Sequence, residues 1–195
     1  MKNYYLNWFL GFALIYVIIQ VVTLELPERD TQDKPPRILS ENTVEVPVID
    51  EESVTCLAKN AYFEARNQSI LSQIAVSQVV LNRVKSPDFP NTVCGVVYEA
   101  QISKWYKENM NKEVPIRNRC QFSWYCDGKS DEPNKDSEQW FKAMDYARIV
   151  YSGRLVFDLT EGSTHYHATY VRPSWAKTKT RTTRIESHIF YRWEK

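Results

Sequence analysis

The sequence lacks an excess of charge of either sign, since 25 Lys and Arg face 24 Asp and Glu for a formal net charge of +1. A chain so nearly neutral sets up no strong field toward nucleic acid or an acidic lipid surface. The sequence also lacks the spacings of common metal sites, because it contains no Cys-x-x-Cys, His-x-x-x-His or His-Glu-x-x-His pattern. We therefore expect no nucleic-acid partner, no bound metal and no cofactor.

Internal repeats and low-complexity tracts are absent as well. A length of 195 residues suits one domain of ordinary size plus a tail, and such a chain can bury a sizeable core. Aromatic residues, in contrast, are plentiful: they make up 13% of the chain, with six Trp and twelve Tyr. These rings either pack in the core or form a surface that stacks on sugars or bases.

The N-terminal segment from Tyr4 to Leu24 carries no charge, and about twenty apolar residues are enough to cross a bilayer core. No small-x-small cleavage site follows it, which favours an uncleaved anchor over a signal peptide. Lys2 precedes the segment and favours a cytoplasmic N-terminus. We expect residues 1–24 to form a single-pass membrane anchor, with the rest of the chain outside the cytoplasm. A buried core helix is the alternative.

Residues 25–52 are polar and include Pro35, which is typical of a spacer. We expect one folded domain after the spacer, over residues 53–195. Within it, residues 101–119 are polar, basic and poorly periodic, which predicts a surface loop. The basic run at 177–184 is interpreted as a second solvated loop, and contact with an anionic polymer is the alternative.

Three segments of the domain carry the apolar period of a helix. The first is a stripe over 54–65, and the second is an almost wholly apolar helix over 70–84, with Ser69 as its candidate N-cap. A capping-box pattern over 136–139 starts the third, which ends before Gly153.

After Gly153 the apolar period changes to two, which predicts short strands at 154–160, 163–171 and 184–192. The apolar segment at 92–100 is compatible with either a helix or a strand. Helices followed by short antiparallel strands make the predicted fold α+β.

Four cysteines, an even number in a chain expected to be exported, indicate two disulfides. Of the three possible pairings we prefer Cys56–Cys94 with Cys120–Cys126. A zinc site and a cysteine nucleophile paired with His are the alternatives. The cysteine spacing disfavours zinc, and an oxidising compartment disfavours a free thiol.

Glu64 is the strongest candidate for chemistry. At 100° per residue it falls at the edge of the apolar stripe of its helix, next to Leu57. Partial desolvation disfavours the charged form of such a carboxyl and raises its pKa, and a general acid has to be protonated near neutral pH. The alternative is a structural glutamate that pairs with a cation such as Arg66 or Arg83.

The histidines His165 and His167 alternate with Tyr166 on a predicted strand, so both imidazoles face one way and Tyr166 the other. They are interpreted as a metal pair that needs a third ligand such as His188, as a substrate contact, or as a hydrogen-bonded core feature. Polar groups beside large rings also suit a sugar-binding groove. The groove candidates are Gln121, Phe122, Ser123, Trp124 and Trp175.

Several ordered segments together resemble one family, the cell-wall hydrolases related to the spore-cortex-lytic enzymes of spore-forming bacteria. The resemblance runs from about Val54 to Tyr191. It rests on the segments CLAKNAYFEAR (56–66), QIAVSQVVLNRV (73–84), FPNTVCGVVYE (89–99), CQFSWYCDG (120–128), GSTHYHATYVRPSWA (162–176) and RIESHIFYR (184–192).

The resemblance implies a small lysozyme-like domain that cuts the glycan strands of peptidoglycan between N-acetylmuramic acid and N-acetylglucosamine. It implies that Glu64 is the catalytic acid. Substrate contacts are expected from Gln121, Phe122, Ser123, His165, Tyr166, His167 and Trp175.

Three positions depart from the family pattern. The family continues its Glu-Ala-Arg motif with Gly-Glu, where this chain has Asn67 and Gln68, and it has Gly where this chain has Glu186. No second carboxylate is singled out among Asp127, Asp131, Asp158 and Glu161, which favours a lytic transglycosylase over a hydrolase. A non-catalytic wall-binding module and a wall amidase or peptidase are the alternatives, and an endolysin-like role in phage lysis is as compatible as wall remodelling.

Overall fold

The computed structural model describes residues 49–194, so the predicted anchor over 1–24 and most of the predicted spacer over 25–52 lie outside the described residues. Within the described part, no helix is long and apolar enough to cross a membrane. The first described helix, α2, begins at Glu51, just before the predicted start of the domain at Ser53.

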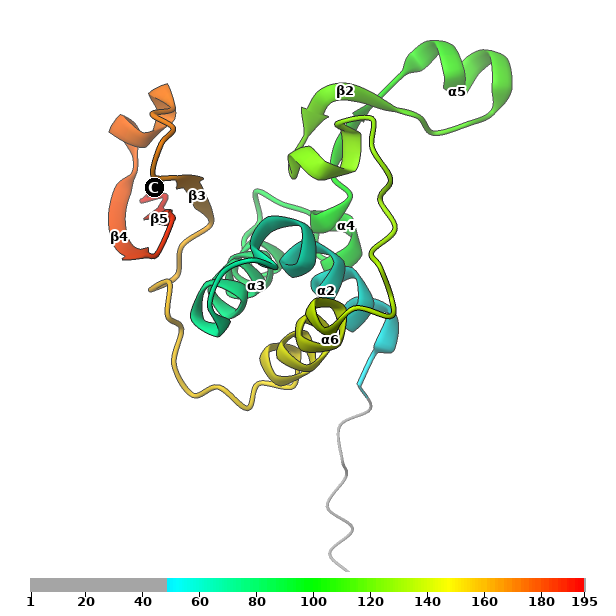
Figure 1. The fold of residues 1–195 in the computed structure, drawn as a ribbon. Coiled ribbons are helices and arrows are strands. Elements are labelled where there is room, and N and C mark those ends of the chain that lie inside the picture. The colour runs from blue at the N-terminus through cyan, green and yellow to red at the C-terminus, as the bar shows by residue number, and fades with distance from the viewer. Residues whose placement is uncertain (1–48, 195) are drawn as a thin grey trace, which may run out of the picture. The chain divides into compact units, whose positions relative to one another are not determined.

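Helices α2 (Glu51–Ala65), α3 (Ile70–Val84) and α6 (Glu138–Tyr151) pack against one another (Figure 1). The short helix α4 (Val93–Val97) covers α2 and α3. Leu57 is fully buried at the centre of the core that these helices share, and burying a side chain of this kind stabilises a fold by about 1.5–3 kcal/mol. The apolar period predicts all three long helices, and the structure confirms them.

The helix ends show where local hydrogen bonding decides a boundary. Ser69 caps α3 as predicted, because its hydroxyl accepts the Ser72 N–H at 3.5 Å. The capping box predicted at Asp136 is wrong: α6 is capped by Ser137, whose hydroxyl accepts the Trp140 N–H at 3.2 Å. The Asn134 side chain accepts the Asp136 N–H at 3.1 Å, and this turn delays the helix by one residue.

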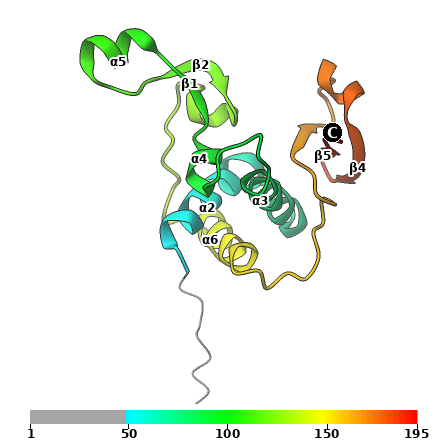
Figure 2. The same cartoon turned by 180° about the vertical axis from the view of Figure 1, so that it is seen from behind.

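The segment over 100–120, here called the arm, differs from the predicted loop. It contains β1 (Ala100–Ile102), α5 (Lys104–Met110) and β2 (Pro115–Cys120), and β1 pairs with β2 in an antiparallel sheet. The arm projects away from α2, α3 and α6 in both views (Figures 1 and 2). Because α5 buries none of its residues, the arm has no apolar stripe from which its structure follows.

A second, three-stranded sheet has the order β3-β5-β4, with all neighbours antiparallel. It is built from β3 (His165–Ala168), β4 (Thr180–Ile185) and β5 (His188–Arg192), and a short 3₁₀ helix η2 (Ser174–Thr178) precedes β4. The basic run over 177–184, predicted to be a loop, therefore lies largely in a strand. The single strand predicted over 184–192 is two strands joined by a tight turn.

The strand predicted over 154–160 is wrong, because this segment forms turns instead. The Asp158 carboxylate organises them: it accepts hydrogen bonds from the Thr160 N–H at 2.8 Å, the Gly162 N–H at 2.7 Å and the Asn82 side chain at 2.8 Å. An Asp that binds backbone N–H groups shortly after itself favours a turn over an extended strand.

The turn between β4 and β5 is tied to α3 by Glu186. Glu186 has a φ of 47°, a left-handed conformation that favours glycine, in accord with the family pattern. Its carboxylate accepts the Ser69 N–H at 3.1 Å and the Ser72 hydroxyl at 3.3 Å. A negative charge is favoured at a helix N-terminus, so the glutamate attaches the hairpin to α3, which a glycine cannot do.

Both preferred disulfides are confirmed. Cys56–Cys94 joins α2 to α4, and Cys120–Cys126 joins the end of the arm to the 3₁₀ helix η1 (Ser123–Cys126). All four cysteines of the chain are therefore paired. This pairing leaves no thiol for the alternative of a cysteine nucleophile.

Asn60 provides a test of the core. It is fully buried in α2, and its side-chain oxygen accepts the indole N–H of Trp124 at 3.1 Å. Asn60→Ala leaves that donor unsatisfied, so we expect the free energy of unfolding to fall by about 1–3 kcal/mol. Asn109→Ala, which removes an exposed bond to the Trp105 carbonyl, should change it by less than about 0.5 kcal/mol. Urea unfolding followed by circular dichroism measures both, and equal midpoints would contradict the role of Asn60.

Candidate active site

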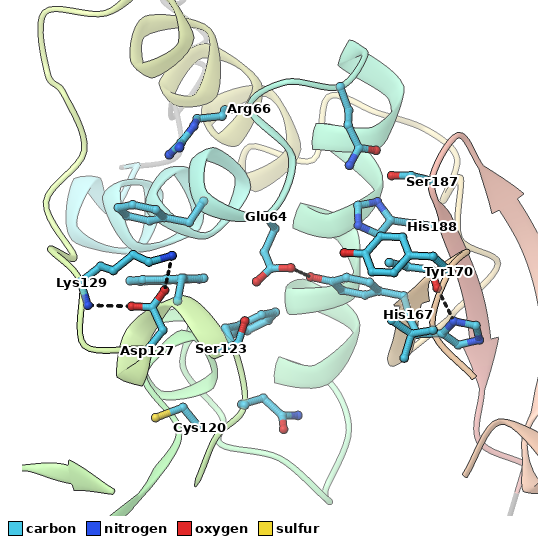
Figure 3. A pocket seen from close by; sticks show the side chains of 18 of the residues that line it. Glu64, Arg66, Cys120, Ser123, Asp127, Lys129, His167, Tyr170, Ser187 and His188 are labelled. Atoms are coloured by element: carbon cyan, nitrogen blue, oxygen red, sulfur yellow. Dashed lines mark hydrogen bonds and ion pairs between the residues drawn. The ribbon is translucent and has the colours of Figure 1, made fainter. Parts of the chain in front are cut away.

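A cleft of about 880 Å³ opens beside the end of α2 (Figure 3). The end of α2 and Arg83 of α3 line its floor, residues 120–130 line one wall, and residues 166–171 with the turn at 187–188 line the other. The cleft therefore collects side chains from five separate parts of the sequence.

Glu64 lies in this cleft, in the last turn of α2, and is partly buried. The hydroxyl of Tyr166 donates a hydrogen bond to its carboxyl oxygen Oε2 at 3.0 Å (Figure 3). Burial raises the pKa of the Glu64 carboxyl above its ordinary value, and the Tyr166 bond and the positive charge of Arg83 only partly oppose that rise. The raised pKa predicted from the edge-of-stripe position is thus confirmed.

The alternative of a structural ion pair is not found. Among residues 49–194, no cation lies within salt-bridge distance of Glu64. Arg66 points away from Glu64 (Figure 3), and its guanidinium lies 4.8 Å from the centre of the Tyr62 ring. Glu64 is left with a neutral hydrogen-bond donor as its closest polar partner.

Tyr166 connects the strand β3 to the end of helix α2 in the site. Burial, together with the nearby Glu64, raises the pKa of the Tyr166 phenol well above its ordinary value, so the hydroxyl keeps its proton and acts as the hydrogen-bond donor to Glu64. The ring packs against His188 at 5.1 Å and Phe190 at 5.6 Å between ring centres. These contacts from β5 fix the direction in which the hydroxyl points.

His165 and His167 both lie on the opposite side of β3 from Tyr166, in contact with Trp175, as the alternation predicts. His167 also reaches the cleft rim, where its Nε2 lies 3.0 Å from the Tyr191 hydroxyl. His165 and Trp175 do not line the cleft. Burial, with the charges of Lys179 and Arg83, lowers the pKa of His165 to about 4, so its ring is neutral at neutral pH.

The described residues contain no group of three or more His, Cys, Asp or Glu side chains arranged to hold a metal. His188, the third ligand considered for a histidine site, contacts the Tyr166 ring instead. Burial lowers the pKa of His188, and its Nδ1 has no hydrogen-bond partner within the part of the chain that the structure describes.

The opposite wall carries the predicted groove residues. Gln121, Phe122, Ser123 and Trp124 all line the cleft. The Trp124 ring stacks on Phe63 with centres 4.7 Å apart and a 19° angle between planes, and its indole is held by Asn60. A rigid aromatic surface therefore borders the space beside Glu64.

Of the carboxylates considered as a second catalytic group, Asp127 alone lines the cleft. It accepts the backbone N–H of Lys129 at 2.8 Å and lies 3.6 Å from the Lys129 ammonium (Figure 3). Asp158 serves the turn described above, and Asp131 and Glu161 lie outside the cleft lining. Asp127 therefore lines the cleft as a carboxylate that is paired with the Lys129 ammonium.

The sequence singles out no role for several cleft residues, among them Gln68, Lys129, Tyr170 and Ser187, and it suggests Arg83 only as a structural ion-pair partner of Glu64. The sequence does contain a signal for Arg83, because it is the one charged residue of helix α3. Gln68 follows the helix end, and no periodicity indicates where its side chain lies.

The model of the cell wall hydrolase family matches residues 67–191, well over half of the chain. The chain belongs to the cell wall hydrolase family. The match begins just after Glu64, so the role of this residue rests on the cleft geometry and on the resemblance of its motif.

Spore cortex-lytic enzymes are similar over shorter stretches. The one from Bacillus cereus is 45% identical over 49 residues, which are 25% of this chain and 19% of that protein. The one from Halalkalibacterium halodurans is 38% identical over 71 residues, which are 36% and 21% of the two chains. The chain thus spans about a fifth of the length of these relatives.

Two solved structures are similar to the chain as well. The catalytic domain of the Bacillus cereus SleB protein is 25% identical with a TM-score of 0.47, and the match covers 78% of this chain and 99% of that one. The catalytic domain of the germination-specific lytic transglycosylase SleB from Bacillus anthracis is 24% identical with a TM-score of 0.48, over 75% and 98% of the two chains.

Tyr166→Phe removes the hydrogen bond that favours the charged form of Glu64. We expect the pKa of Glu64 to rise further, by about one unit. Tyr191→Phe removes a hydroxyl that contacts His167 instead, so it should leave the pKa of Glu64 unchanged. The ¹³C signal of the Glu64 carboxyl, assigned by comparison with Glu64→Gln, follows the titration. An identical midpoint in Tyr166→Phe and the native chain would contradict the assigned contact.

Proposed function

We propose that this chain cleaves the glycan strands of peptidoglycan between N-acetylmuramic acid and N-acetylglucosamine, with Glu64 as the general acid. The observation that carries the proposal is a partly buried carboxyl of raised pKa, positioned by Tyr166 at the floor of an open cleft. Membership of the cell wall hydrolase family supports the choice of polymer.

In the first step, Glu64 donates its proton to the oxygen between the two sugars. The bond from that oxygen to the muramyl C1 breaks, and an oxocarbenium-like centre develops at C1. The acid has to be protonated at neutral pH for this step, and burial of Glu64 favours that state. The stacked rings of Phe63 and Trp124 give the cleft lining an apolar border suited to the faces of sugars.

In the second step, the Glu64 carboxylate acts as a base. If it removes the proton of the muramyl C6 hydroxyl, O6 bonds to C1 and a 1,6-anhydro sugar results. If it removes a proton from water, a reducing end results. We favour the anhydro product, because Asp127 is the one candidate second carboxylate in the cleft lining and its charge is compensated by Lys129.

We further propose that the apolar segment Tyr4–Leu24 anchors the chain in the bacterial inner membrane, with the folded domain outside the cytoplasm. The length of the segment and its lack of charge support an anchor. Two disulfides in the folded domain support an oxidising compartment.

The test compares the fragments that the full chain and its Glu64→Gln variant release from purified peptidoglycan, identified by mass spectrometry. We expect anhydro-muramyl fragments from the native chain and a loss of about 100-fold or more in Glu64→Gln. Glu161→Gln, the same substitution at an exposed carboxylate outside the cleft, should cut like the native chain.

Other outcomes separate the alternatives. Reducing muramyl ends together with a strong loss in Asp127→Asn would indicate a hydrolase with two carboxylates. Equal cutting by Glu64→Gln and the native chain would remove Glu64 from the mechanism. Wall binding without cutting by either chain would indicate a binding module.

A further inference from the structure

Arg83 is a cation enclosed in the floor of the cleft. Its side chain is only 5% exposed, although it belongs to the apolar helix α3. The guanidinium lies between two aromatic rings, 5.3 Å from the centre of Phe89 and 5.0 Å from the centre of Phe122. Its Nε donates a hydrogen bond to the Thr164 carbonyl at 2.7 Å.

One nitrogen of this guanidinium is not satisfied. Its Nη1 is buried and has no hydrogen-bond partner, and Arg83 forms no salt bridge within residues 49–194. A buried cation without a bonded anion is costly. Burial lowers the pKa of Arg83, and the nearby Tyr166, Glu99 and Glu64 oppose that shift, yet a guanidinium keeps its charge in proteins.

We propose, on the basis of the function proposed above, that Arg83 is a positioning residue whose fixed positive charge stabilises Glu64 after Glu64 has given up its proton. While Glu64 is a neutral acid, the charge of Arg83 in the floor of the cleft is offset only by Glu99, which lies nearby without forming a salt bridge to it among residues 49–194. Once the proton has moved to the glycosidic oxygen, the new carboxylate faces that charge. When Glu64 takes a proton back from the C6 hydroxyl or from water, the first state returns.

Arg83 also supports the geometry of the same step. The Thr164 carbonyl that it binds lies just before β3, and β3 carries Tyr166, whose hydroxyl binds Glu64. One side chain thus provides a charge near the acid and holds the strand that orients it. The two contributions are separable, because the hydrogen bond uses Nε whereas the charge does not depend on that bond.

Other charged groups around Glu64 are less suited to this role. From α2, Arg66 points away (Figure 3), and on the opposite wall Lys129 is paired with Asp127. His167 of β3 contacts Tyr191, and burial lowers the pKa of His188 of β5, which makes it neutral near pH 7. Glu99, between α4 and β1, is an anion near Arg83 and has a buried carboxyl oxygen without a partner.

Three substitutions separate charge from hydrogen bonding. Arg83→Gln places an amide N–H where Nε stood, so it retains the bond to Thr164 and loses the charge. Arg83→Met, whose side chain is about as long as that of glutamine, loses both. Arg83→Lys retains the charge. Arg148→Gln, which removes an exposed arginine paired with Glu51, controls for loss of a cation far from the cleft.

The readout is the pH dependence of peptidoglycan cleavage by the full chain. Cleavage requires protonated Glu64, so the rate falls as the pH rises through the pKa of Glu64. Without the cation the carboxylate is less stable, and we expect this fall to move about one pH unit higher in Arg83→Gln and Arg83→Met. A weaker acid also transfers its proton more slowly, so kcat should drop up to about tenfold while KM changes little.

Arg83→Lys should keep the fall at its native pH, as should Arg148→Gln. A folded Arg83→Gln with the native pH profile would overturn the proposal and reduce Arg83 to a structural residue. If Arg83→Gln does not fold, Arg83→Lys provides the test. A folded Arg83→Lys variant with a shifted pH profile would also overturn the proposal, because it retains the positive charge. Full cleavage by Glu64→Gln would instead contradict the proposed function itself.

Discussion

The hydrogen bond between Tyr166 and Glu64 joins residues that lie 102 positions apart in the sequence. One partner ends a core helix and the other belongs to the small sheet, so the cleft exists only when sheet and helices are assembled correctly. Phe190 of β5 packs with Ala75 and Val79 of α3, and this contact holds the sheet at the height where the phenol reaches the carboxyl.

Glu64 and Arg83 face a shared problem, since Glu64 is partly and Arg83 almost fully removed from water, and neither has a bonded counterion within residues 49–194. Glu64 resolves it by remaining protonated, as its raised pKa indicates. Arg83 cannot lose its charge, and aromatic faces and one carbonyl surround it instead. The arrangement is stable with a neutral acid, and ionisation of that acid adds a second anion near Arg83 beside Glu99.

The sequence allows the helical core to be predicted well, because apolar stripes over α2 and α3 record which faces are buried. It predicts the partial burial of Glu64 for the same reason, since a carboxylate at the edge of an apolar stripe lies at the edge of the core. It does not predict that His165 and Trp175 lie outside the cleft, because alternation along a strand fixes a face but no distance. The position of Gln68 and the strand β4 depend on long-range contacts that no local pattern records.

The arm over residues 100–120 is a part of the domain whose sequence and length are free to change. Its strands pair with each other, its helix α5 contributes nothing to the core, and the Cys120–Cys126 bond fastens its end to η1. Segments of this kind tolerate insertion and exchange, because their length is decoupled from the packing of the domain. Evolution can therefore reshape the outline of this protein at the arm while the chemistry beside α2 stays as it is.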